Sequence, residues 1–505
     1  MTARPPAPAR TTARPIAALA AACAFAFAAA LAAGAGASGA AAPAPKAAAP
    51  APAPAPPAAA SAPGPRLKYA PESGLAPGRA LVLRPEVLAV KEHTLANGLR
   101  LLLVEDHSVP SISYYTFYDV GSRLERPGIT GISHLFEHMM FNGARKYGPK
   151  EFDLFLERAG GSSNAYTTRD DTVYYADFPP AALPVVMDLE SDRMGGLDIR
   201  PTVLANEQEV VLEERHTRVD DNPEGALDEL LWATAFIAHP YSWPILGWEK
   251  DIVRTSRDDC MAYYRAHYAP NRATIVAVGD FATADFLRLA ERFYARIPAG
   301  PARPRTATPE PEQFGERRVD YRRASEIPIL LMGYKSPAAA DPDTLALDGV
   351  QYLLGEGDSA RLYRRLVHRD EVANWVYVDF PWHVDPGLFI VGVGVKAGVD
   401  PRRVEKIVDE EIADLADHGP NPAELTKVRR LLEMSFLRAL ETNASRAETI
   451  GTYQLLMGDW RVLDDVLETY RTLSAERIRA IASHYLRKDS RTVATLHPLE
   501  DGGDK

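Results

Sequence analysis

Two histidines and a glutamate, His134, Glu137 and His138, lie within five positions of the chain in the stretch GISHLFEHMM. The histidines are four residues apart, so on an α-helix they share a face, with side chains roughly 6 Å apart. Two imidazole nitrogens placed in this way can bind one zinc ion. Glu137 can then lean over the metal without binding it, where a general base takes a proton from a zinc-bound water. The pattern predicts a hydrolytic metal site.

The alternative is an ordinary helix that happens to carry two histidines. The residues that flank the three polar side chains are mostly apolar: Ile132, Leu135, Phe136, Met139, Met140 and Phe141. Polar side chains in such surroundings are costly to bury unless they bind something. We therefore favour the metal site.

A catalytic zinc ion needs a third protein ligand besides two imidazoles. The segment LANEQEVVLEERHTRVDDNPEG offers four glutamates, Glu207, Glu209, Glu213 and Glu214. Glu207 and Glu214 are seven residues apart and share a helix face, and Val210 and Val211 between them are expected to bury that side. The other two glutamates should face solvent. One of the first pair can bind the metal while the other hydrogen-bonds a histidine ligand. Spacing alone leaves open which does which.

With these motifs in place, the sequence resembles the inverted-zincin family of metallopeptidases, which includes pitrilysin, insulinase and the mitochondrial processing peptidases. The resemblance covers residues 97–143, 159–179 and 239–252 most strongly. In that family the third ligand is a glutamate about 76 residues beyond the second histidine, and another glutamate lies seven residues before it. The resemblance therefore implies Glu214 as the zinc ligand and Glu207 as the residue that supports a ligand.

The segment SNAYT follows two glycines and is short, polar and able to form a strand. An edge strand there could bind a substrate peptide as an added strand, and a plain hairpin edge is the alternative. The family resemblance implies that Asn164 and Ala165 bind substrate.

One segment departs from the family pattern. Many members carry an arginine and a tyrosine, seven residues apart, that hold the substrate carbonyl and the oxyanion. In SARLYRRLVHRDEVANWVYVDF, these positions are Val367 and Asn374. Side chains from a shifted register are one substitute: Arg364, Arg365, Arg369 or Tyr377. Alternatively, another chain could supply the arginine and the tyrosine. Because the family includes two-subunit enzymes, we predict a heterodimer with a homologous subunit that lacks H-x-x-E-H.

The resemblance implies a zinc-dependent endopeptidase that hydrolyses peptides or unfolded polypeptides by a glutamate-activated zinc-bound water. A non-catalytic scaffold or assembly subunit of the same fold is the alternative, and a zinc-dependent binding protein is a third possibility. Every motif position of the first half is retained, including Glu137, which favours the enzyme.

The elements that must position these residues mix strands and helices without strict alternation, which indicates an α+β fold. HTLANGLRLLLVED predicts a hairpin with an Asn-Gly turn. Helical patterns are predicted around residues 128–143, 149–160, 180–196, 201–219, 223–237, 256–266 and 283–296.

The chain divides into a catalytic domain at 88–300, a proline-rich linker at 301–318, a second domain at 319–497 and a tail at 498–505. An offset of 218 residues aligns the two domains and places the H-x-x-E-H positions on Tyr352, Gly355 and Glu356. The second copy therefore lacks the metal ligands. We expect two homologous domains, each a mostly antiparallel sheet packed with helices, that form a clamshell.

Residues 1–37 have the layout of a secretory signal peptide, and residues 38–87 form an Ala/Pro-rich tether. An uncleaved anchor and a lipid attached to Cys23 are the alternatives. The alanine-rich run makes a poor anchor, and too little apolar sequence precedes Cys23. We therefore expect a periplasmic or secreted protein, in which Cys260 is left without a cysteine partner.

The net charge is −11, and the first 66 residues contain five basic residues and no acidic residue. The remainder therefore carries about −16, the overall charge less these five positive charges. Such an acidic body argues against nucleic acid or an anionic membrane as the main partner. We expect no stable membrane span.

Overall fold

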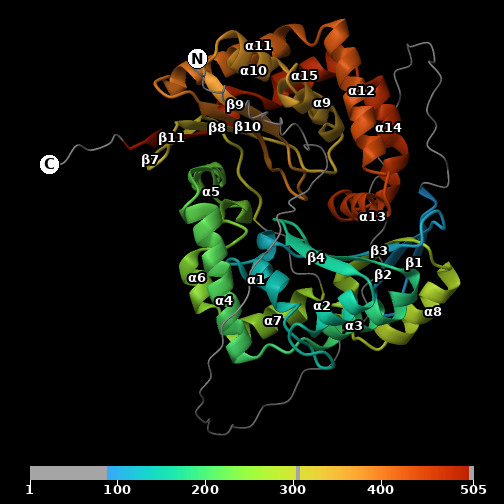
Figure 1. The fold of residues 1–505 in the computed structure, drawn as a ribbon. Helices are drawn as coiled ribbons and strands as arrows, with labels where there is room; N and C mark the ends of the chain where they lie inside the picture. The colour runs from blue at the N-terminus through green and yellow to red at the C-terminus, as the bar shows by residue number, and fades with distance from the viewer. Residues whose placement is uncertain (1–87, 303–307, 500–505) are drawn as a thin grey trace, which may run out of the picture.

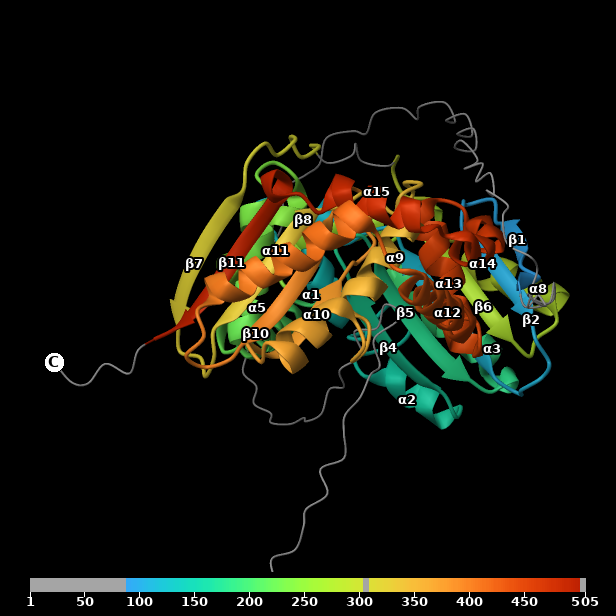
Figure 2. The ribbon, with the colours of Figure 1, turned by 90° about the horizontal axis from the view of Figure 1, so that it is seen from above.

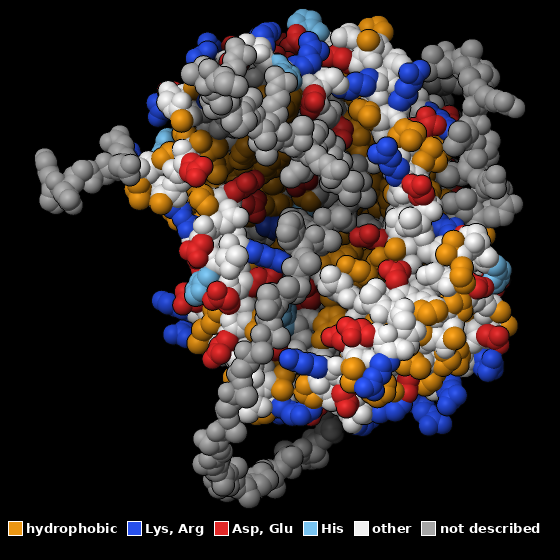
Figure 3. All heavy atoms as spheres, viewed as in Figure 1, with side chains coloured by type: hydrophobic (Ala, Val, Ile, Leu, Met, Phe, Trp, Pro, Cys, Tyr) orange, Lys and Arg blue, Asp and Glu red, His pale blue; other side chains and the backbone are white. Residues whose placement is uncertain are grey.

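A computed structural model describes residues 88–302 and 308–499. The predicted signal peptide and tether lie outside these residues. The described chain forms two halves, each a β-sheet with helices packed against it (Figures 1 and 2). The space-filling view shows a hollow between the two halves (Figure 3). The predicted α+β class with two sheet-and-helix domains is confirmed.

The first sheet has six strands in the order β1-β2-β6-β3-β5-β4. The strands are β1 Lys91–Thr94, β2 Arg100–Glu105, β3 Ile112–Tyr118, β4 Ser162–Thr167, β5 Thr172–Phe178 and β6 Ala273–Gly279. β2 and β6 are parallel and the other neighbours are antiparallel. The β1–β2 pairing confirms the predicted hairpin. β3 has no exposed residue because both of its faces are covered.

In its described residues the first half has eight helices, and seven of them lie close to their predicted positions. The eight are α1 Ile132–Met139, α2 Glu151–Arg158, α3 Leu183–Gly196, α4 Pro201–Arg215, α5 Pro223–Ala235, α6 Glu249–Arg254, α7 Arg257–His267 and α8 Thr283–Tyr294. The short helix α6 was not predicted. A π-helical turn, His216–Asp220, extends α4. Asn222 caps α5 by accepting from the backbone N–H groups of Glu224 and Gly225.

The second half repeats the topology of the first. Its strands are β7 Arg317–Arg323, β8 Ile329–Lys335, β9 Ala373–Asp379, β10 Leu388–Val395 and β11 Arg491–Pro498. Their order, β7-β11-β8-β10-β9, matches β2-β6-β3-β5-β4, and β7 and β11 are again parallel. Its helices are α9 Thr344–Gly355, α10 Arg361–Tyr363, α11 Pro401–His418, α12 Pro422–Arg438, α13 Asn443–Thr452, α14 Leu463–Thr472 and α15 Ala475–Tyr485.

Each half lends one helix to the other. α5 packs against β7, β8 and β11 of the second sheet, and α13 packs against β3 and β6 of the first. The α13 contact depends on Gly451, because a Cβ atom there would lie 2.0 Å from the Phe117 ring on β3. The hydrophobic contacts of each sheet therefore include a helix from the other half, and these contacts join the two halves.

Hydrogen bonds of Glu310 fix the described part of the connection between the halves to the end of the first half. The Glu310 carboxylate accepts hydrogen bonds from the backbone N–H groups of residues 237–239, which follow α5. β7 begins at Arg317, two residues before the expected start of the second domain. Within the described residues, no helix is both long and apolar enough to cross a bilayer.

Candidate metal centre

Helix α1, which carries His134, Glu137 and His138, is anchored at its amino end. It begins after Gly131, which has a φ of 85°. The buried Glu125 carboxylate accepts hydrogen bonds from the backbone N–H groups of Gly131 and Ser133, both at 2.8 Å. These N–H groups have no partner within the helix, so a carboxylate there stabilises its first turn.

A second anchor is a close backbone contact between the start of α1 and the loop 239–252. A Cβ atom on Gly131 would lie 2.4 Å from the Leu246 carbonyl oxygen. A Cβ atom on Gly247 would lie 2.3 Å from the Thr130 carbonyl oxygen. Only glycine fits at both positions, and both have positive φ. The loop that resembled the family therefore contributes by fixing the position of α1.

Helix α4 faces α1 and supplies the glutamates. The Arg215 guanidinium donates to the Gly247 carbonyl oxygen at 2.9 Å and to the Glu229 carboxylate at 2.8 Å. These contacts tie α4 to the same loop that holds α1. Val211 is fully buried as expected, but Val210 is 48% exposed, so the prediction that both valines are buried was wrong.

The structure brings together three of the predicted residues. One ligand atom from each of His134, His138 and Glu214 lies within 4.8 Å of the others. Glu214 Oε2 lies 3.5 Å from His134 Nε2 and 3.4 Å from His138 Nε2. Ligands about 2.0–2.1 Å from a tetrahedral zinc ion are about 3.3 Å from one another. The donor set and its spacing therefore fit zinc.

The other predicted residues of the centre flank these three. Glu207 Oε2 lies 3.3 Å from His138 Nδ1, the ring nitrogen that does not face Glu214. Glu137 Oε2 lies 3.9 Å from His134 Nε2. Sequence reasoning missed Arg218, whose Nη1 lies 2.8 Å from Glu214 Oε1 and leaves Oε2 to face the histidines. Its position four residues after Glu214 was a usable signal.

The protonation states of the two histidines differ. Burial, together with a smaller effect of the neighbouring His138, lowers the pKa of His134 to about 3. Burial acts the same way on His138, but hydrogen bonds to Glu207 and Glu214 outweigh it and raise the pKa to about 9. Against its own burial, Glu214 has a pKa lowered to about 2 by the His138 contact. Without metal, His138 is therefore protonated, and its positive charge lies between the Glu207 and Glu214 carboxylates.

Glu137 has the surroundings of a general base. Burial raises the pKa of its carboxyl. A raised pKa makes a carboxylate a better proton acceptor near neutral pH. Its side chain is 20% exposed, so a water molecule can reach it.

The strand β4 forms an edge of the first sheet, next to this centre. β4 pairs only with β5 among the described strands. Asn164 is exposed, whereas Ala165 is buried, and the Asn164 side-chain oxygen accepts from the Ala165 backbone N–H at 2.9 Å. A bound peptide would have to displace that local hydrogen bond to pair with the N–H group.

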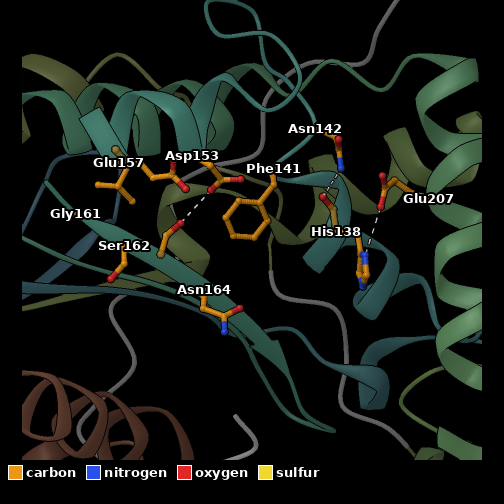
Figure 4. A pocket seen from close by; sticks show the side chains of 11 residues that line it. His138, Phe141, Asn142, Asp153, Glu157, Gly161, Ser162, Asn164 and Glu207 are labelled. Carbon is orange, nitrogen blue, oxygen red and sulfur yellow. Dashed lines mark hydrogen bonds and ion pairs between the residues drawn. The ribbon is translucent and has the colours of Figure 1, made fainter. Parts of the chain in front are cut away.

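A pocket of about 430 Å³ lies between the metal centre, the start of β4 and helix α2 (Figure 4). His138, Asn142 and Glu207 line one end of it, and Ser162 and Glu157 line the other. The pocket places Asn164 beside a space that is large enough for a side chain of a bound peptide.

The positions that lack the arginine and the tyrosine lie in the second half. Val367 packs against the core and Asn374 is exposed on β9. Arg365 pairs with Asp370, Glu410 and Glu411, and Arg369 pairs with Asp370. Tyr377 stacks on Trp375, with ring centroids 5.7 Å apart. These three candidate substitutes are thus engaged within the described chain, and the fourth, Arg364, is exposed.

Two profiles of peptidase family M16 match most of the described chain. The profile described as "Insulinase (Peptidase family M16)" matches residues 100–248, which include the whole metal centre. The profile described as "Peptidase M16 inactive domain" matches residues 254–432. This chain belongs to peptidase family M16. The resemblance stated from the motifs is thereby confirmed.

Relatives of the M16 chain are similar over most of its length. It is 29% identical to "Zinc protease PqqE" of Helicobacter pylori, over 80% of this chain and 92% of that protein. It is 25% identical to "Probable mitochondrial-processing peptidase subunit beta" of Arabidopsis thaliana, over 86% of this chain and 83% of that protein. A solved protease from Helicobacter pylori superposes with a TM-score of 0.79 at 28% identity, over 81% of this chain and 99% of that one.

A solved "peptidase M16 inactive domain" from Pseudomonas fluorescens has a TM-score of 0.75 at 20% identity and covers 83% of this chain and 100% of that one. This likeness shows the fold alone. The M16 fold thus includes chains named as proteases and one named as inactive, so activity must be argued from the residues of the site.

Proposed function

We propose that this protein is a zinc-dependent endopeptidase that hydrolyses peptides or unfolded polypeptides. The observation that carries the proposal is the convergence of His134, His138 and Glu214 at distances of 3.4 and 3.5 Å, with Glu137 beside them. These three side chains would hold the metal. Zinc bound there would supply Lewis acidity to the scissile carbonyl.

The residues of this chain then have separate roles. Glu137 takes a proton from the attacking water and later delivers it to the leaving amine. Glu207 orients His138 through Nδ1, and Arg218 holds the distal oxygen of Glu214. Asn164 and Ala165 on the edge of β4 bind the substrate backbone as an added strand.

We infer that a homologous subunit without H-x-x-E-H supplies the arginine and the tyrosine that Val367 and Asn374 replace. The ion pairs of Arg365 and Arg369 support this proposal, because they already occupy these side chains. The amino-terminal pattern of residues 1–37 supports export, so we place the protein in the periplasm or outside the cell.

Replacement of the base tests the function. Glu137→Gln should lower the rate of peptide cleavage by at least about a hundredfold, because the amide cannot accept the proton. Zinc content measured by elemental analysis should stay at the wild-type level. Glu209→Gln, an exposed change on α4, is the matched control and should keep both cleavage and zinc. Cleavage that survives in Glu137→Gln would show that another group is the base.

A further inference from the structure

The pocket beside His138 has an acidic wall that the metal centre does not use. Asp153 and Glu157 come from α2, four residues apart, and their side chains face the start of β4 (Figure 4). None of the 11 lining residues is a lysine or an arginine. The third acidic residue of the lining, Glu207, already has a partner in His138. Apart from the metal centre at His138, the two carboxylates of α2 therefore face a cavity whose lining has no lysine or arginine.

The surroundings of the two carboxylates leave room for a positive charge. Asp153 accepts one hydrogen bond from Ser163 Oγ at 3.2 Å. Within the described residues, no basic side chain comes within ion-pair distance of Asp153 or Glu157. Burial raises the pKa of Asp153, against the lowering effects of the Ser163 hydrogen bond and of the more distant Arg193 charge, and the neighbouring Glu157 adds a smaller rise. A cation in the pocket would be stabilised by the partly buried Asp153 carboxylate and by the exposed Glu157 carboxylate.

The edge strand decides which substrate residue meets this pocket. β4 pairs with β5 in the antiparallel sense, and a peptide added antiparallel to β4 would run from Thr167 toward Ser162. The pocket starts at His138, a residue of the metal centre, and extends to Ser162. The part of such a peptide that follows the scissile bond therefore passes over the pocket.

We propose that this pocket selects a lysine or arginine side chain immediately C-terminal to the scissile bond. The proposal rests on the peptidase function proposed above and names its substrate class. The apolar stem of the basic side chain would pack on Phe141 and Leu156, and its charged end would lie between Asp153 and Glu157. Unfolded segments rich in basic residues are the substrates that this pocket would favour.

Matched peptides test the selectivity. Three quenched fluorescent peptides that differ only in the residue after the scissile bond would carry lysine, norleucine or glutamate. We expect kcat/KM for the lysine peptide to exceed that for norleucine by at least about tenfold, since only the charge distinguishes them. Mass spectrometry of the products would fix the bond that is cut.

Variants assign the selectivity to the pocket. In Asp153→Asn with Glu157→Gln, the lysine-to-norleucine ratio of kcat/KM should fall close to one, and Glu157→Lys should favour the glutamate peptide. Glu209→Gln, whose side chain does not line the pocket, should keep the wild-type ratio. A wild-type ratio near one, a ratio unchanged in the double variant, or cuts after rather than before the basic residue would overturn the proposal.

A binding measurement separates this inference from the proposed function. Fluorescence anisotropy of the same peptides with the Glu137→Gln variant, with zinc added, requires no turnover. Preferential binding of the lysine peptide by at least about tenfold, together with a wild type that cuts nothing, would retain the pocket and reject the peptidase. Cleavage of all three peptides at equal rates, with equal binding, would retain the peptidase and reject the pocket.

Discussion

His134 and His138 share a helix face but have opposite pKa shifts. His134 is buried and neutral, whereas His138 holds a proton between the Glu207 and Glu214 carboxylates. In the metal-free protein this pairing also stabilises the fold. Because the folded pKa of His138, about 9, lies above the ordinary value of 6.5, the stabilisation is complete below pH 6.5 and is lost as the pH rises through about 9.

Zinc affinity should therefore depend on pH with a slope of one proton. Zinc must displace the His138 proton, so the dissociation constant should fall about tenfold for each pH unit between pH 6 and pH 9 and then level off. Competition with a chromophoric chelator measures this dependence. In Glu207→Gln the plateau should begin at a lower pH, because one carboxylate that raises the pKa is lost. A pH-independent affinity would contradict this assignment of the proton.

For single residues, the sequence was sufficient to predict the type of chemistry, but it did not predict which side chains contact one another. The spacing of His134, Glu137 and His138 was enough to predict a metal site, because helix geometry alone places them on one face. The choice between Glu207 and Glu214 needed the family resemblance. Arg218 and the acidic pair on α2 were missed, since their roles depend on which element packs beside them.

Close backbone contacts at its start hold helix α1 in place, in addition to the buried side chains of its apolar face. The approach of Gly131 to Gly247 sets the distance between α1 and the loop, and Arg215 ties α4 to the same loop. A substitution in that loop should therefore alter the geometry of the metal centre, although it changes none of the side chains of the centre.

Gly247→Ala should lower both the free energy of unfolding and the affinity for zinc. The added Cβ atom would lie 2.3 Å from the Thr130 carbonyl oxygen, at a φ of +81°. We expect a loss of about 2–4 kcal/mol of stability in urea unfolding, from overpacking together with the cost of a positive φ. Gly128→Ala is the control, because Gly128 also has a positive φ but no atom within 4 Å of the added Cβ. Equal losses in the two variants would show that the close contact has no role.

Most helices and the β1–β2 hairpin could be predicted from periodicity and turn residues. The edge position of β4 was also expected, and the strand order confirms it. The exchange of α5 and α13 between the halves could not be predicted, because it depends on contacts between residues far apart in the chain. Nothing in the local pattern of α5 distinguishes a helix that covers its own sheet from one that covers the other sheet.

The two halves of the described chain share one topology, and the first half carries the H-x-x-E-H residues. Five strands of each sheet follow the same order, yet Tyr352, Gly355 and Glu356 were the positions aligned with H-x-x-E-H. The gapless offset of 218 residues pointed to this relation, and the matching strand order supports it. The second half contributes structure through α13, while Val367 and Asn374 stand at the positions where many family members carry the arginine and the tyrosine.

The missing pair predicts dependence on a partner. The zinc-loaded protein alone should cleave peptides slowly, and addition of a homologous subunit with an arginine and a tyrosine at the two positions should raise kcat by at least about tenfold. Light scattering during size-exclusion chromatography should show a heterodimer of the two chains. Full activity of this chain as a monomer would refute the partner proposal.

The position of the metal tests the account most directly. Crystals of the zinc-loaded protein, measured on both sides of the zinc absorption edge, should show one anomalous peak per chain between His134 Nε2, His138 Nε2 and the Glu214 carboxylate. His134→Ala, which removes a ligand, should abolish that peak and lower zinc retention. A fully folded wild-type protein with no zinc at this position, or with Glu214 turned away from the two histidines, would contradict the account.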